Sequence, residues 1–556
     1  MSAVSYTNFT SGLVSPKLAG DYTSSIYHSG CSVLENFLVM LQGGITRRPP
    51  LAKASDAQGV RLIPFTLDVD RSYAVELGYG PTSGWFRMWS LGEDGSAVNQ
   101  SEGTTPFSLE EIPSVQFAQS NDTMYLVHRS HTPQKLHTNA GKWQMDSISP
   151  YLVHAKGDDG GDSGIIDDID NIGMLTSDGD HPGCVAYCYN RLWFASSDKH
   201  PYRLWSSRPF EPENFEMYDL VKVVDDTTTA QDIIDAIETG QEEISVSPSY
   251  TWRKTIREDN AMRLDAESND AIRWIASRMN LVVGTSSGES VIPGTCNALN
   301  QTLSPISTYG SAKGIQALNA NSEVLFVQSG GRRLRSLVYS SDGYSVLDLT
   351  YQCDRIFAAH GGVVSMAWRR VPEPTLYVVL HDGTLAVLSY DRGYGLCAWA
   401  HWSFPQGLAM DVCVLDSEIG QNVLLLMDRN GSISIERLSD VDAADSMDVQ
   451  YKDLGSLEYE SEVETNPYEV NSSSYGSSLG KKKRMRSIVC RLYMSKSFVA
   501  GYGEKYMKPY RGDTGLNDRE VLLPGGYEGF VKMKVKSQGG DALTLLAFAV
   551  ETEVER

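Results

Sequence analysis

The chain has 556 residues, of which 41% are hydrophobic, and a formal net charge of -22 at pH 7. One hydrophobic core rarely serves more than about 250–300 residues, so this length predicts about two to four domains. The acidic balance argues against a general nucleic-acid-binding surface, because phosphates are bound mainly by Lys and Arg. Met1–Gly20 lacks the apolar core of a signal peptide, and no apolar run approaches the length of a membrane span. The eight cysteines show no zinc spacing and are expected to be reduced and mostly buried.

Residues 1–60 are predicted to form an N-terminal arm with a short helix. The helix is expected over Ser32–Met40, which places Val33, Leu34, Phe37 and Leu38 on one apolar side. Gly43-Gly44 should end the helix, and Arg47-Arg48 would form a basic tip.

Residues 61–220 and 269–440 repeat the pattern of a β-hairpin. In Thr375–Tyr390, two apolar strands flank Asp382-Gly383, a dipeptide that takes the positive φ of a tight turn. Glu323–Tyr339 and Asn422–Leu438 repeat this arrangement, and the later copies begin roughly 45–50 residues apart, which is typical of four-stranded propeller blades. The pattern predicts a mainly β protein with a β-propeller-like core. An ordinary protein of several β-sheets remains the alternative.

Two segments interrupt this pattern. Residues 156–181 are acidic and rich in Gly, and Asp158, Asp159 and Asp162 offer oxygen ligands of the kind that Ca²⁺ prefers. The spacing of an EF-hand is missing, so a solvated surface insertion is the favoured interpretation. Residues 221–268 are interpreted as an insertion between blades that contacts a neighbouring subunit, with a helix expected over Ala230–Glu238.

The C-terminal part of the chain begins with a polar linker over residues 441–485. Its end, Lys481–Arg486, is interpreted as a basic strand edge that blocks further pairing, with a nucleic-acid patch as the alternative. Residues 486–556 are predicted to form a C-terminal antiparallel β-domain with strands at Ser487–Met494, Gly529–Val535 and Leu543–Val550.

The search for an active site finds no HExxH helix, no GxSxG elbow and no GxGxxG turn. We therefore expect no enzyme, and we assign no catalytic, cofactor-binding or metal-binding residue. An axial funnel with two converging carboxylates would be needed for glycosidase chemistry. A receptor- or glycan-binding propeller would instead need exposed aromatic residues, for which the candidates are Trp85, Trp89, Trp399 and Trp402.

A series of short motifs follows one another along most of the chain. The first part contains Asn8–Gly12, Ser15–Asp21, Gly30-Cys31, Leu34–Phe37 and Gln42–Pro49, and the later motifs are Arg61–Phe65, Tyr73–Gly78, Ile112–Asp122, Asp270–Ile275, Leu281–Glu289, Asp382–Leu385, Trp399 and Trp402. In this order they resemble the tail nozzle proteins of short-tailed bacteriophages, also described as tail tubular B-like or stabilisation proteins.

This resemblance implies a structural virion protein of the phage tail, made in the host cytoplasm, that forms the distal part of a short tail tube through which DNA is ejected. It implies a homo-hexameric ring that joins the head-to-tail adaptor and portal assembly, holds tail fibres or a distal plug, and lets DNA pass. If the negative charge lines the lumen, DNA should slide along the wall without adhering. No membrane span and no cofactor are expected.

The N-terminal arm is not needed to close a propeller, so it is expected to contact neighbouring subunits. The candidate interface residues in this arm are Asn8, Phe9, Pro16, Leu34, Asn36, Phe37, Arg47 and Arg48.

Overall fold

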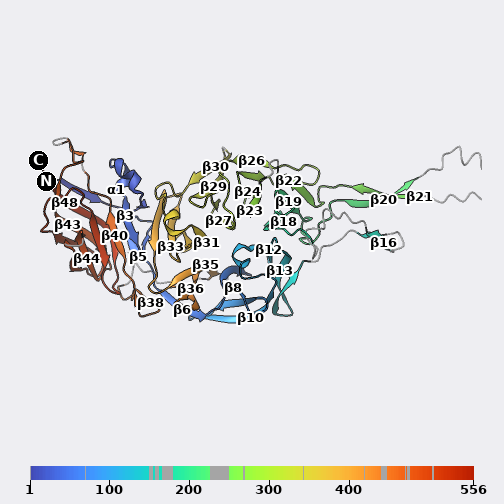
Figure 1. Cartoon of the computed structure of the whole chain (residues 1–556), viewed down its shortest axis with the longest axis horizontal. Coiled ribbons are helices and arrows are strands. Elements are labelled where there is room, and N and C mark those ends of the chain that lie inside the picture. The colour runs from blue at the N-terminus through green and yellow to red at the C-terminus, as the bar shows by residue number, and fades with distance from the viewer. Residues whose placement is uncertain are drawn as a thin grey trace, which may run out of the picture.

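A computed structural model describes residues 2–68, 70–148, 154–156, 162–165, 179–225, 249–266, 270–341, 343–418, 420–439, 447–469, 471–472, 476–503 and 506–555. The molecule is elongated and consists almost entirely of β-strands (Figure 1). A β-propeller occupies its middle, a β-sandwich lies at one end, and two hairpins project from the other end. No helix in the described part of the chain is long and apolar enough to cross a bilayer.

The propeller has seven four-stranded blades among the described residues. Blade 1 consists of β7 (Arg61–Thr66), β8 (Ser72–Tyr79), β9 (Gly84–Leu91) and β10 (Ala97–Thr105). Blade 2 consists of β11 (Gln116–Ser120), β12 (Thr123–His128), β13 (His131–Asn139) and β14 (Lys142–Ser147). Blade 3 consists of β17 (Cys184–Cys188), β18 (Arg191–Ala195), β19 (Arg203–Ser206) and β22 (Met262–Asp265).

Blades 4 and 5 consist of β23 (Ile272–Ser277), β24 (Leu281–Thr285), β25 (Glu289–Ile292) and β26 (Ser304–Ser307), and of β27 (Leu318–Ala320), β28 (Glu323–Val327), β29 (Leu334–Ser340) and β30 (Gly343–Asp348). Blade 6 has β31 (Val363–Arg369), β32 (Thr375–Leu380), β33 (Leu385–Asp391) and β34 (Leu396–Trp402), and blade 7 has β35 (Leu408–Ser417), β36 (Gly420–Arg429), β37 (Ser432–Leu438) and β6 (Leu51–Asp56).

Blade 7 closes the ring with strands from both sides of the propeller sequence. Its outer strand β6 precedes blade 1 in the chain and pairs antiparallel with β37, with Leu51 opposite Leu438. The propeller is therefore closed by backbone hydrogen bonds between its first and last strands, which leaves no open gap between first and last blade.

The predicted hairpins are confirmed, and their turn residues have the expected backbone conformations. Gly383 has a φ of 79° between β32 and β33, and the Asp382 carboxylate accepts a hydrogen bond of 3.1 Å from the Thr384 amide. Asn430 and Gly431 have φ values of 56° and 88° between β36 and β37. Positive φ at both central residues is what a type I′ turn requires, so these sequences specify the strand register locally.

Two hairpins are inserted into the ring and project from the same end of the molecule (Figure 1). The first pairs β15 (His154–Lys156) with β16 (Asp162–Ile165), and the second pairs β20 (Asp219–Asp225) with β21 (Ser249–Thr255) inside blade 3. The expected helix Ala230–Glu238 and the acidic residues Asp158 and Asp159 lie outside the described residues.

The β-sandwich combines both ends of the chain. One sheet has the order β4 (Phe37–Val39), β5 (Ile45–Arg47), β48 (Thr544–Val554), β43 (Lys483–Tyr493) and β46 (Leu516–Leu522), with β1 (Ser2–Tyr6) paired to β48. The other sheet continues blade 6 through β2 (Gly12–Leu13), β3 (Gly30–Glu35), β40 (Glu462–Thr465), β47 (Met533–Ser537), β44 (Ser497–Tyr502) and β45 (Lys508–Arg511). Their facing side chains share one core with part of the propeller.

Two local predictions are wrong in this region. Ser32–Met40 is not a helix but forms β3 and β4, because β3 pairs with the distant strand β40 and β4 pairs with the neighbouring strand β5. The short helix α1 lies earlier, at Ser25–His28. The basic residues of Lys481–Arg486 that belong to β43 do not form an open sheet edge, since Lys483 pairs with Val554 of β48 on one side and bridges to Glu528 on the other. Lys483 is buried there and forms an ion pair of 2.6 Å with Glu469.

Candidate functional site

The motif-rich N-terminal segment, Asn8–Pro49, lies at the junction between the propeller and the sandwich. We call this junction the seam. Gly12 of β2 pairs in parallel with Gly30 and with Trp399 of blade 6. Gly12 has a φ of +57°, and a Cβ at this position would lie 2.5 Å from the Trp399 carbonyl oxygen. Only glycine meets both requirements without strain, so the close approach of the two domains depends on this residue.

Asn36 joins three segments at the seam. It lies in the left-handed region with a φ of 54°, which Asn tolerates better than most residues. Its side-chain oxygen accepts hydrogen bonds from the Ser403 amide at 3.0 Å and from Arg48 Nε at 3.1 Å, while its amide nitrogen donates to the Glu460 carbonyl at 2.8 Å. Asn36 thus holds the arm, the end of blade 6 and the segment before β40 in one register.

Arg48 forms a fully buried ion pair with Asp453. Its two terminal nitrogens lie 3.0 and 2.7 Å from the two carboxylate oxygens, and both side chains have 0% exposure. Burial alone would lower the pKa of Arg48, but Asp453 raises it above its ordinary value. The guanidinium also packs 3.7 Å from the centroid of the Tyr459 ring, so every face of this cation has a partner.

Arg47 is buried beside Arg48 and forms no ion pair with a carboxylate of the described residues. It donates hydrogen bonds to the carbonyls of Gly539, Asp541 and Tyr459 at 3.0, 2.6 and 2.6 Å. Burial lowers the pKa of Arg47 from its ordinary value. Because its acceptors belong to the C-terminal third of the chain, Arg47 fastens the N-terminal strands to the C-terminal ones.

Six of the eight candidate interface residues are buried inside this chain. Asn8 is half-buried and Pro16 is exposed, whereas the other six are buried against this same chain, so their side chains are not on a surface that a neighbouring subunit could contact; these six are Phe9, Leu34, Asn36, Phe37, Arg47 and Arg48.

The four candidate Trp residues do not form an exposed face. Trp89, Trp399 and Trp402 are buried, and Trp399 and Trp402 donate hydrogen bonds of 2.8 Å to the carbonyls of Leu349 and Phe37. Trp85 is half-buried beneath Arg87. Three of the four side chains are therefore used in packing.

An axial cavity of about 360 Å³ lies in the propeller, between residues of β7, β11, β27, β31 and β35. Asp411 is its one carboxylate among the described lining residues, and it accepts hydrogen bonds of 2.8 Å from the amides of Leu62 and Val412. Burial raises the pKa of Asp411. A hydrolytic site of the usual glycosidase type needs two carboxyl groups, and the described lining offers one.

Arg61 borders the same cavity and is satisfied by the main chain. It donates hydrogen bonds to the carbonyls of Ile112 and Pro113 at 2.8 and 3.0 Å. Burial lowers the pKa of Arg61. Both charged groups of the cavity thus hold neighbouring blades in place, and neither shows the arrangement of an acid–base catalyst.

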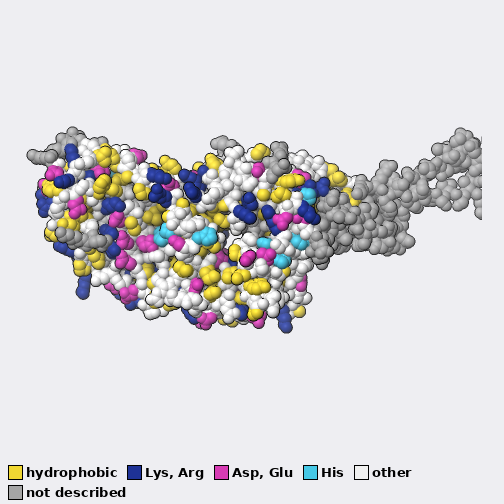
Figure 2. Space-filling model, in the orientation of Figure 1, with side chains coloured by type: hydrophobic (Ala, Val, Ile, Leu, Met, Phe, Trp, Pro, Cys, Tyr) yellow, Lys and Arg dark blue, Asp and Glu magenta, His cyan; other side chains and the backbone are white. Residues whose placement is uncertain are grey.

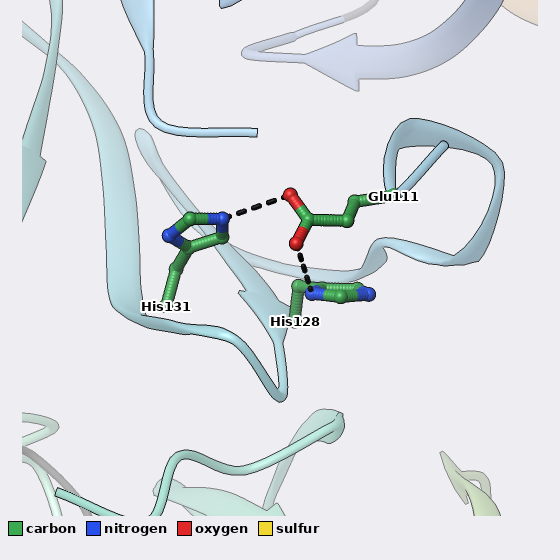
Figure 3. Close-up of side chains that lie close together, drawn as sticks. All are labelled: Glu111, His128 and His131. Carbon is green, nitrogen blue, oxygen red and sulfur yellow. Dashed lines mark hydrogen bonds and ion pairs between the residues drawn. The ribbon is translucent and has the colours of Figure 1, made fainter. Parts of the chain in front are cut away.

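Sequence analysis missed one cluster, which lies between blades 1 and 2. Glu111 precedes the short helical turn η2 (Ile112–Ser114), while His128 ends β12 and His131 begins β13 (Figure 3). His131 Nε2 lies 2.8 Å from Glu111 Oε2, and His128 Nδ1 lies 3.8 Å from Glu111 Oε1. The His-x-x-His spacing across the hairpin turn was the available signal, but the carboxylate that completes the cluster is distant in sequence.

The protonation states in this cluster follow from its surroundings. Burial raises the pKa of Glu111, but hydrogen bonds from the Ser108 amide and from His131 outweigh it and lower the pKa to about 2. Burial lowers the pKa of His128, so its imidazole is neutral over a wider pH range than usual. At neutral pH the cluster therefore holds a carboxylate and a neutral imidazole.

No family model matches this chain, and no curated protein is similar to it in sequence. Solved structures with a similar fold include "Structure of U3-55K", with 11% identity over 70% of this chain and 98% of that chain at a TM-score of 0.35. They also include the BBS1N chain of a complex with ARL6DN, with 11% identity over 71% and 98% at a TM-score of 0.36. The Neurospora crassa Pan2 WD40 domain has 8% identity over 59% and 88% at a TM-score of 0.28. These likenesses carry no functional argument, and the blades are defined by the strand order.

Proposed function

We propose that this protein is a structural component of a short bacteriophage tail that resembles a tail nozzle and forms the distal part of the tube through which DNA is ejected. The observation that carries the proposal is the ordered series of motifs that begins at Asn8–Gly12 and continues through the propeller. Its densest part, Asn8–Pro49, forms the seam, so these motifs have a structural role in joining the two domains.

The shape of the chain suits this role. The sandwich and the projecting hairpins lie at opposite ends of the long axis (Figure 1), so that one chain can span a tube wall lengthwise. In the proposed homo-hexameric ring, one end would attach to the head-to-tail adaptor and portal assembly and the other would hold fibres or a distal plug. The role is mechanical and includes no catalysis, and the protein would be located in the virion.

The net charge of -22 supports the passage of DNA without adhesion. On the face shown in Figure 2, acidic and basic side chains are interspersed, so this face carries no continuous acidic surface. If the lumen is acidic, it is lined by another face of the molecule. A neutral or basic lumen in an assembled tail would contradict this part of the proposal.

Native mass spectrometry of the purified chain, combined with negative-stain imaging, tests the proposal directly. We expect a ring of six chains with a central hole, or a monomer that joins isolated phage tails. A monomer that fails to join tails and instead binds glycans of the host surface would overturn the proposal in favour of a receptor-binding propeller. The burial of Trp89, Trp399 and Trp402 removes the main structural argument for that second function.

A further inference from the structure

Glu111, His128 and His131 have the composition and arrangement of a binding site for a divalent transition metal ion. Their ligand atoms all lie within 4.8 Å of one another, and they come from two separate segments of the ring. The three side chains are 21%, 17% and 27% exposed, so the cluster is sheltered while remaining open to solvent on one side.

Glu111 is hydrogen-bonded to His131 but not to His128. Glu111 Oε2 accepts hydrogen bonds from the Ser108 amide and from His131, both at 2.8 Å. Glu111 Oε1 faces His128 Nδ1 at 3.8 Å, which is too long for a hydrogen bond, and the Ser108 side chain also stabilises the carboxylate. The Ser130 amide donates to His128 Nδ1 at 3.2 Å, so this nitrogen carries a lone pair and no proton.

Glu111 Oε1 and the unprotonated His128 Nδ1, which can each bind a cation, therefore lie 3.8 Å apart, and an ion bound there would replace the Ser130 amide at Nδ1. Zinc binds imidazole nitrogen at about 2.0–2.1 Å and carboxylate oxygen at about 2.0–2.2 Å, so two of its ligand atoms lie at most about 4.3 Å apart. The separation of Oε1 and Nδ1 falls within this limit. His131 would exchange its Nε2–H hydrogen bond to Glu111 for a bond to the ion, with the imidazole proton moving to Nδ1 as the ring changes tautomer and rotates slightly.

The backbone holds the ligands in place before any ion binds. His128 and His131 face each other across a two-residue hairpin loop, with their positions set by the pairing of β12 and β13. The Ser108 amide fixes the carboxylate of Glu111, which corresponds to the outer hydrogen bonds that orient ligands in known metal sites. Arg129 lies in the turn between the histidines, and its guanidinium forms an ion pair of 3.6 Å with Asp198 of blade 3.

We propose that Glu111, His128 and His131 bind one divalent transition metal ion of the zinc class, with a water molecule completing the coordination. Two imidazoles and one carboxylate favour such an ion over Ca²⁺ or Mg²⁺, which prefer sites made only of oxygen ligands. The ion would fasten the connection between blades 1 and 2 to the β12–β13 hairpin and so stabilise the ring.

The test is a titration of the full-length, tag-free protein with Zn²⁺ by isothermal calorimetry, after removal of metal with a chelator. We expect saturable binding of one equivalent. Glu111→Gln and His128→Ala should each weaken it by at least the roughly 10–100-fold that is lost when an outer partner of a metal ligand is removed. Zn²⁺ should also raise the melting temperature of the wild-type protein and not that of the variants, because an ion bound to the folded state stabilises it.

His137→Ala is the matched control. His137 lies on β13 and forms a similar pair with Asp146 of β14 at 2.9 Å, but no second histidine completes it. This variant should bind Zn²⁺ like the wild type. The melting curves in chelator show that each variant is folded, and Glu111→Gln, which keeps the shape of the side chain, is the variant least able to disturb the fold. Absence of saturable binding by the wild type, or equal binding by Glu111→Gln, would overturn the proposal.

Discussion

The propeller and the sandwich are both β-structures, but they are assembled in opposite ways. Each of blades 1 to 6 uses strands that follow one another along the chain, and only blade 7 borrows a strand from elsewhere. In the sandwich, by contrast, β4 and β5 from the first 47 residues share a sheet with β43 and β48 from the last 75 residues. The blades are local structures, whereas the sandwich depends on pairing between the two ends of the chain.

The two regions also differ in what lies buried. The blade interiors are packed mainly with aliphatic and aromatic side chains, such as those around β28 and β32, and their buried charges, such as Glu76, Glu289 and Asp411, are spread over separate blades. The seam buries Arg47, Arg48 and Asp453 together with the amide of Asn36. Buried charges need partners in specific positions, so the seam accepts one arrangement of its segments, while apolar packing tolerates more variation. The following predictions test this difference, from the largest expected effect to the smallest.

Arg48→Ala should destabilise the sandwich by about 3–5 kcal/mol, because it removes the bidentate partner of the buried Asp453 carboxylate and leaves only Arg429, 3.9 Å away. Hydrogen exchange should show lost protection in β43 and β48 and retained protection in β24 and β28. Arg48→Ala combined with Asp453→Leu should recover part of the loss, since no unpaired charge remains. Equal loss of protection in both regions would mean that ring and sandwich unfold as one unit.

Leu325→Ala should destabilise the ring by about 2–4 kcal/mol through the cavity left in the core of blade 5. Leu325 has 0% exposure and packs in the core shared by blades 5 and 6. Chemical denaturation gives the size of the effect, and hydrogen exchange should place it in β28 and its neighbours. If the sandwich strands lose protection first, the ring is not the independent unit that its local strand order implies.

Gly12→Ala should cost about 1–3 kcal/mol, because the added methyl group would approach the main chain of Trp399 where β2 joins blade 6. The positive φ of Gly12 adds to the strain. Gly431→Ala is the matched control, since Gly431 also has a positive φ but has nothing within 4 Å of an added Cβ. A larger loss for Gly12→Ala than for the control measures the importance of the close approach at the seam.

Glu462→Gln should cost about 1 kcal/mol near neutral pH, because Glu462 bridges Lys534 and Lys536 at 2.9 Å each across β40 and β47. Burial raises the pKa of Glu462, but the two lysines outweigh it and lower the pKa below its ordinary value of 4.5. The stabilisation is therefore complete above that value and is lost as the pH falls through the lowered pKa.

Denaturation of wild type and Glu462→Gln at a series of pH values should show the difference closing in acid. Arg71→Ala is the baseline on the ring, since its ion pair with Asp68 is exposed to solvent and should contribute little to stability. A pH-independent difference for Glu462→Gln would show that its effect does not come from its charge.

How far the fold could be predicted depended on how local its determinants were. Asp382-Gly383 and Asn430-Gly431 specify their turns within a few residues, and the apolar strands beside them follow a short pattern, so the hairpins and the propeller were predictable. The prediction for Ser32–Met40 was wrong, because its apolar residues also fit a helical spacing. The strand β40 that pairs with β3 lies more than 400 residues away in the sequence. The prediction that Lys483 lies on a basic strand edge failed for a similar reason. The buried Glu469 that neutralises its charge is not identifiable from composition.

The candidate sites show the same difference between features set by nearby residues and features set by distant ones. The N-terminal motifs were recognised, yet the burial of Arg47 and Arg48 inside one chain required the C-terminal strands to be in place. The cluster of Glu111, His128 and His131 escaped notice, because its carboxylate comes from the connection between two blades.

By itself, the sequence determined the β-class, the hairpin repeat and its turns, because backbone preferences and alternating burial act between near neighbours along the chain. Only the tertiary structure decided that β6 closes the ring, that both chain ends share one sandwich, and that Arg48 meets Asp453. These pairings depend on the fit and the charge of segments separated by hundreds of residues, and their energies exist only when the segments are brought together.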